Sequence, residues 1–156
     1  MSPVGNQDYH DILAALTARR ARFLVVGAHA LAAHGYPRAT VDIDIWIDRA
    51  PENVHRVWLA LADFGAPLDD LQIREEDLTR PDIVAQFGLP PNRIDVLTGV
   101  TGLSFERAWP NRIEDELEGV RVPVLGIADL IENKRATGRD RDRADVQGLE
   151  GKGDAG

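Results

Sequence analysis

The chain has 156 residues and no cysteine, which excludes disulfides and cysteine-ligated zinc sites. It has no apolar run long enough to span a membrane and no N-terminal segment of signal-peptide type. Basic residues are few, 18 against 26 acidic ones, and the net charge of -8 argues against an extended nucleic-acid-binding face. We therefore expect a cytoplasmic protein without membrane contact, long enough for one domain with a buried core.

Hydrophobic periodicity divides the chain into short helices and strands. Helical patterns predict helices at 6–19, 28–35, 51–64, 104–109, 127–137 and 141–150, with one more short helix inside 66–81. Strand patterns predict strands at 22–27, 41–48, 82–88, 93–99, 112–119 and 120–125. The last two form a hairpin, in which Pro123 places the second strand at a sheet edge. We expect one α+β domain over 1–150 and a disordered tail over 151–156.

Residues 41–48, "VDIDIWID", alternate apolar and mostly acidic side chains, as a half-buried strand does. Asp is a poor strand former, and residues i and i+2 of a strand lie about 7 Å apart on one face. Asp42 and Asp44 therefore repel each other, and only a bound cation turns the repeat into a stabilising feature. A solvated strand face is the alternative. Asp48, at the strand end beside Arg49, is interpreted as a solvated terminating residue.

Magnesium suits such a carboxylate pair, because it prefers hard oxygen ligands and binds through one or two carboxylates plus substrate phosphates. Two ions about 3.5–4 Å apart can clamp the attacking and leaving oxygens of a phosphoryl transfer. Gly27, between the apolar run "RFLVV" and an Ala-rich helix, adds to this context. Its backbone admits a phosphate, and the amides at the helix start favour one. A simple turn glycine is the alternative.

A third carboxylate, Asp95, lies between two aliphatic residues in "RIDVL". It is interpreted as a third metal ligand or as the base that takes a proton from an attacking hydroxyl. An ion pair with a neighbouring Arg explains it equally well.

Three further residues are candidates for binding phosphate or for supporting the acids. Arg38, just before the acidic strand, either holds a phosphate oxygen or pairs with a nearby Asp. Thr40 orients a strand acid or simply favours the strand. Lys134 lies on the apolar stripe of its helix, so its ammonium either reaches the acidic cleft or extends to solvent.

The C-terminal stretch "GRDRDRAD" alternates charges, which is typical of a helix surface with many ion pairs. We assign Arg141 and Arg143 to such a surface. Arg139, beside the predicted helix break at Gly138, reaches the cleft, and Asp145 is an internal partner for Arg139 or Lys134.

Taken together, "GAHALAAHGYPRATVDIDIWID", "RIDVLTG" and "ADLIENKRATGRDRDRADVQGLE" resemble the nucleotidyltransferase-fold superfamily. The similarity covers roughly 21–150, and the branch it resembles is that of short bacterial toxin–antitoxin (abortive-infection type) nucleotidyltransferases. It implies a mixed sheet flanked by helices, with Gly27 and Ala28 at the phosphate turn. It also implies Asp42 and Asp44 as metal ligands and Asp95 as third carboxylate.

The resemblance implies an enzyme that uses Mg²⁺ or Mn²⁺. A nucleoside monophosphate moves from a nucleoside triphosphate such as ATP to a hydroxyl, and pyrophosphate is released. The acceptor stays open among a protein, an RNA 3′ end and a small molecule. Ala28 stands where many members have Ser or Gly, which favours two alternatives: an inactive nucleotide- or partner-binding module, and one component of a toxin–antitoxin pair with a cognate antitoxin. Trp46, on the face of the acids, walls the nucleotide pocket or covers the sheet.

Overall fold

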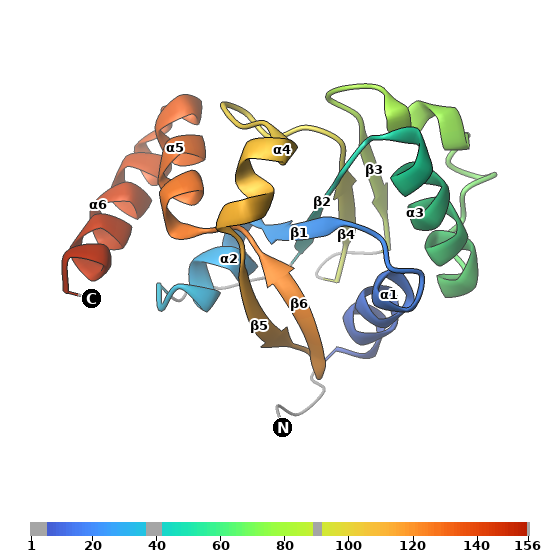
Figure 1. Cartoon of the computed structure of the whole chain (residues 1–156), viewed down its shortest axis with the longest axis horizontal. Coiled ribbons are helices and arrows are strands. Elements are labelled where there is room, and N and C mark those ends of the chain that lie inside the picture. Colours follow the sequence, from blue (N-terminus) through green and yellow to red (C-terminus); the bar gives the residue numbers. More distant parts are fainter. Residues whose placement is uncertain (1–5, 37–41, 89–91, 156) are drawn as a thin grey trace.

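The apolar run and the acidic stretch of the sequence form neighbouring antiparallel strands in the middle of a sheet (Figure 1). The structure is a computed structural model, which describes residues 6–36, 42–88 and 92–155. β1 (Phe23–Val26) is buried along its whole length, as its continuous apolar sequence predicts. β2 (Ile43–Ile47) pairs with it from its last residue back to Asp44, which lies opposite Val26.

Within the described residues, six strands form one sheet in the order β3-β4-β2-β1-β6-β5. The four outer strands are β3 (Val84–Phe87), β4 (Ile94–Leu97), β5 (Ile113–Leu117) and β6 (Val120–Val124). The β2–β4 and β1–β6 pairs are parallel, and the other three are antiparallel. The sheet is therefore mixed, and with its helices it confirms the predicted α+β fold.

Capping residues mark some of the helix ends. They are α1 (Gln7–Ala18), α2 (Gly27–Ala33), α3 (Pro51–Phe64), α4 (Phe105–Ala108), α5 (Ile127–Thr137) and α6 (Asp140–Ala155), with 3₁₀ turns η1 (Glu75–Thr79) and η2 (Trp109–Asn111). The Asn6 side chain caps α1, and that of Ser104 caps α4. Gly65 and Gly138 end α3 and α5 in the left-handed conformation.

Two pairs of helices lie on opposite sides of the view in Figure 1, with α4 between them. α1 and α3 pack against each other through apolar stripes that include Leu13, Leu16 and Leu61. α5 and α6 pack against each other on the other side, next to the end of β6. None of the helices in the described part of the chain combines the length and apolarity needed to cross a bilayer.

The structure differs from the sequence-based expectations at two places. β6 is not an edge strand, since it lies between β1 and β5. Pro123 is tolerated because it precedes the β1–β6 pairing, which begins at Val124 and continues with Leu125 N donating to the Val25 carbonyl. α6 continues to Ala155, so a backbone segment expected to be disordered is helical. Propagation from the preceding helical turns outweighs the low helix propensity of its glycines.

Candidate functional site

The parallel pairing of β2 with β4 brings the predicted acids together. Asp44 is in direct register with Asp95, and Asp42 precedes Asp44 by two residues on the same face. Asp95 is only 8% exposed. Three carboxylates thus gather around the start of two adjacent strands, where nothing in the propensities of Asp favours them.

The acids perturb one another and their surroundings. Burial, the charge and hydrogen bond of Asp95 and the charge of Asp42 together raise the pKa of Asp44 to about 7. Tyr9 of α1 lies close by, and its hydroxyl donates to the Arg93 carbonyl over 3.1 Å. Burial and the charges of the three acids raise the pKa of Tyr9 to about 12. Such a cluster of unfavourable charge is a common sign of a functional site.

Position 27, at the turn from β1 into α2, needs a glycine because the Asp44 side chain lies against it. Its φ is 68°, a left-handed value. A Cβ atom at this position would lie 2.3 Å from the Asp44 Oδ2 atom. The turn glycine therefore makes room for a carboxylate, which is a closer link between the two motifs than the sequence predicts. Its contact with phosphate stays a prediction.

A cavity of about 450 Å³ opens next to these residues. Gly27, Ala28, Asp42 and Asp44 line one part of it, and the basic residues Lys134, Arg139 and Arg141 line another. Arg141 was assigned to the helix surface, and the structure places this exposed side chain at the cavity as well. One cavity thus combines acidic and basic walls.

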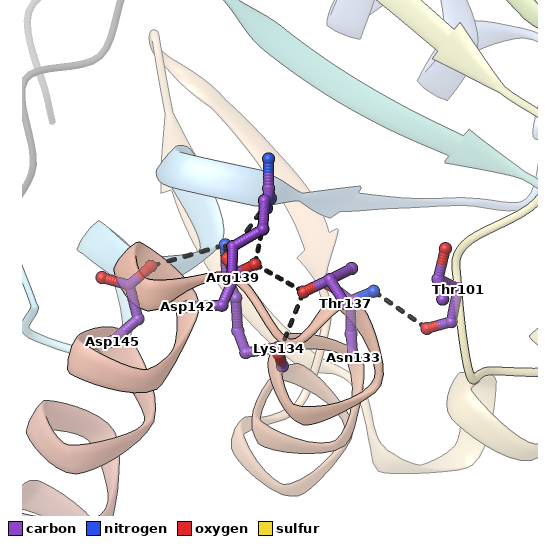
Figure 2. Close-up of polar contacts among 7 residues, drawn as sticks. All are labelled: Thr101, Asn133, Lys134, Thr137, Arg139, Asp142 and Asp145. Atoms are coloured by element: carbon purple, nitrogen blue, oxygen red, sulfur yellow. Dashed lines mark hydrogen bonds and ion pairs between the residues drawn. The ribbon is translucent and has the colours of Figure 1, made fainter.

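Lys134 is held inside the protein by the carboxylates of α6 (Figure 2). Its Nζ atom lies 3.4 Å from Asp142 Oδ1 and 3.5 Å from Asp145 Oδ2, and both acids are buried. The side chain of Lys134 is 10% exposed, so the alternative in which it extends to solvent is wrong. Asp145 is a partner of Lys134, as one of the two predicted pairings requires.

Asp142 binds three groups at once (Figure 2). The Thr137 hydroxyl and the Arg139 Nε atom each donate to its Oδ2 atom over 2.6 Å, in addition to the Lys134 ion pair. Burial alone would raise the pKa of Asp142, but hydrogen bonds from Arg139 and Thr137 and the charge of Lys134 hold it well below its usual range. Asp142 therefore holds two of the three basic residues that line the cavity, Lys134 and Arg139.

Arg93, one residue before β4, bridges two of the acids. Its Nη2 atom donates to Asp42 Oδ2 over 3.0 Å, and its Nε atom lies 3.3 Å from Asp95 Oδ1. The ion pair weighed as an alternative role for Asp95 is thus present. Among the residues that the structure describes, no three His, Asp or Glu side chains are gathered so that they could hold a metal ion.

The donor chemistry at the acids nevertheless fits a hard divalent cation. Asp42 Oδ1 and Asp95 Oδ1 are buried, and neither atom makes a hydrogen bond within the described structure. Buried oxygens in this state are uncommon and call for a ligand or a movement.

The remaining residues that the sequence singled out lie outside the described residues or away from the cavity. Arg38 and Thr40 lie outside the described residues. Trp46 is 2% exposed and its ring meets that of Phe105 edge-on at 5.1 Å, so it covers the sheet and does not line the cavity. Asp48 pairs with Arg22 and accepts from Ala50 N, as a strand-terminating residue does.

Sequence reasoning missed the roles of Tyr9 and Asp142, and it weighed an ion pair of Asp95 with a neighbouring Arg without predicting that Arg93 also reaches Asp42. Arg93 carried a signal, since it lies two residues before Asp95 and shares its strand face. Asp142 could have been found as an acid that follows Lys134 by eight residues, beyond the helix break at Gly138. Tyr9 gave none, because its helical spacing predicts a core residue and the fold alone brings α1 to the acids.

A mixed sheet with an acid pair at a central strand, a third acid in register and a glycine turn beside them is the arrangement that the nucleotidyltransferase resemblance implies. Residues 9–150 match the family described as "nucleotidyltransferase of unknown function (DUF6036)", and the chain belongs to this family. The resemblance noted in the sequence is thereby confirmed at the level of the family. A comparison with curated proteins found no match.

Proposed function

We propose that the protein is a metal-dependent nucleotidyltransferase that moves a nucleoside monophosphate from a nucleoside triphosphate to a hydroxyl in the cytoplasm. The observation that carries this is the single cavity in which Asp42 and Asp44 share the lining with Lys134 and Arg139. A bound triphosphate needs both kinds of lining residue, because the acids hold a divalent ion and the basic side chains contact the phosphates, and together these cations offset the negative charge of the triphosphate.

Each residue has a defined part in this proposal. Asp42, Asp44 and Asp95 hold Mg²⁺ or Mn²⁺, which supplies electrostatic stabilisation of the phosphoryl oxygens when bound. Gly27 and Ala28 present backbone amides to the phosphates at the start of α2. Lys134 and Arg139 bind phosphate oxygens, with Asp142 and Asp145 fixing their positions. Arg38 and Thr40 are proposed to support the same phosphates.

The chemistry balances without a further reactant. The acceptor hydroxyl oxygen bonds to the α-phosphorus, the bond from that phosphorus to the β-phosphate oxygen breaks, and pyrophosphate leaves. The hydroxyl proton passes to a carboxylate, for which we propose Asp95. In support of a carboxylate as the proton acceptor, burial and the neighbouring acids raise the pKa of Asp44, the register partner of Asp95, to about 7.

The test uses a triphosphate labelled at the α-phosphate, with Mg²⁺ or Mn²⁺ and with protein, RNA and small hydroxyl compounds as acceptors. Wild type should transfer label and release pyrophosphate, and Asp44→Asn should reduce both by at least about 10²-fold. Asp48→Asn is the matched control, because Asp48 ends the same strand but does not line the cavity. Equal activity of wild type and Asp44→Asn would refute the proposal.

A second function is favoured by Arg93, whose guanidinium already pairs with Asp42 and Asp95. The protein could then bind nucleotide or a partner without turnover, for example as one component of a toxin–antitoxin pair. Both functions predict that a triphosphate raises the melting temperature. Pyrophosphate release separates them, since the binding module gives none.

A further inference from the structure

We propose that Arg93 is an internal counter-ion that occupies the acidic cluster until a divalent cation displaces it. The inference rests on the proposed function and adds a form of regulation to the same site. It starts from the bridge described above, in which one guanidinium reaches Asp42 and Asp95. Without that charge, three carboxylates would face one another across β2 and β4.

The bridge is incompletely hydrogen-bonded. Arg93 Nη2 donates well to Asp42, but Arg93 Nε and Asp95 Oδ1 both lack a hydrogen bond although they lie 3.3 Å apart. Asp42 Oδ1 is also buried without a hydrogen bond. A permanent structural bridge would normally use the fork of the guanidinium in two parallel bonds. The contact therefore compensates charge while leaving oxygen donors for a better cation.

The guanidinium can leave without disturbing the fold. The Arg93 carbonyl accepts from the Tyr9 hydroxyl and from Ile43 N over 3.0 Å, so the backbone is fixed from two elements. The Arg93 side chain is 34% exposed, in contrast to 11% for Asp95. A side-chain rotation of Arg93 toward solvent therefore frees the acids, and the buried Asp95 has less room to move than Arg93 has. Displacement of Arg93 and assembly of the metal ligands become one event.

The experiment measures Mn²⁺ binding by calorimetry, in the absence of nucleotide, on wild type, Arg93→Gln and Arg93→Lys. We expect Arg93→Gln to bind Mn²⁺ about tenfold more tightly than wild type, since metal no longer displaces a charge-assisted hydrogen bond. Lys keeps the charge but lacks the fork, so Arg93→Lys should be intermediate and should remain folded. Arg22→Gln is the matched control, because Arg22 pairs with Asp48 away from the cavity.

Thermal unfolding gives a second readout. Arg93→Gln should melt below wild type without metal and gain more from Mn²⁺ than wild type does. If neither Arg93 variant binds Mn²⁺ more tightly than wild type, Arg93 forms a permanent structural ion pair with the acids and the inference is wrong. Failure of the proposed function is distinguishable: label transfer by wild type would then be absent even if Arg93→Gln binds Mn²⁺ more tightly.

Discussion

Replacing Gly27 with Ala tests the link between the turn and the acids. Two costs apply. The left-handed φ of 68° costs a residue with a Cβ atom about 1–2 kcal/mol. The Cβ atom would also lie 2.3 Å from Asp44 Oδ2, so this half-buried carboxylate, next to Asp95, has to move. Displacements of this kind cost about 1–3 kcal/mol more.

Gly65 provides the matched control. Its φ of 89° is also left-handed, but a Cβ atom there meets nothing within 4 Å. Gly65→Ala should therefore lower the free energy of unfolding by about 1–2 kcal/mol, and Gly27→Ala by about 2–5 kcal/mol. At about 2–4 °C per kcal/mol for a chain of this size, the melting temperatures should be clearly resolved.

Urea unfolding and triphosphate binding are the assays. Gly27→Ala should lose triphosphate affinity, whereas Gly65→Ala should keep it. Shortening the acid removes the clash, so in an Asp44→Ala background Gly27→Ala should cost no more than Gly65→Ala. Equal losses of stability for the two glycine variants in the wild-type background would refute the steric reasoning.

Three further outcomes are expected. The raised pKa of Asp44 means that the native state holds a proton which the unfolded chain, with an ordinary pKa near 4, releases. Stability of the metal-free protein should therefore fall as pH rises from about 4 to about 7 and level off above, and urea titrations should show this component missing in Asp44→Asn. Asp142→Asn removes a buried partner of Lys134 and should cost about 3–5 kcal/mol by thermal unfolding, whereas Asp140→Asn, at an exposed ion pair on the same helix, should leave the melting temperature unchanged. Asn53→Ala breaks three hydrogen bonds to the backbone of 22 and 48 and should cost about 3 kcal/mol in urea unfolding; a loss under about 0.5 kcal/mol would contradict this.

The helices and strands were predicted well from the sequence, but which strands lie next to one another in the sheet was not. Alternation in "VDIDIWID" and the run "RFLVV" identified β2 and β1, and Gly65 and Gly138 ended their helices as predicted. Strand order is a different matter, because it depends on pairings between segments distant along the chain. Pro123 illustrates this: a local rule placed its strand at an edge, whereas the structure places it inside.

The residues of the site also differ in whether local sequence motifs could predict them. Gly27, Asp42 and Asp44 were predicted from local motifs, and the structure brings them to one cavity. Lys134 left two possibilities open, which only the buried carboxylates of α6 resolve. Arg93 shares a strand face with Asp95 in the sequence, but its contact with Asp42 depends on the register of β2 with β4. Tyr9 reaches the acids through the approach of α1, which no periodicity in one sequence encodes.

The position of β1 has a consequence for synthesis. β1 is made early and its partner β2 follows after α2, but its other neighbour, β6, follows only after every element from α2 to β5. Until then a fully apolar strand presents an open edge, which invites pairing with another chain. Long-range pairings of this kind also slow folding. On the ribosome, the strand next to the acids is therefore a segment that a chaperone would protect until the β5–β6 hairpin emerges.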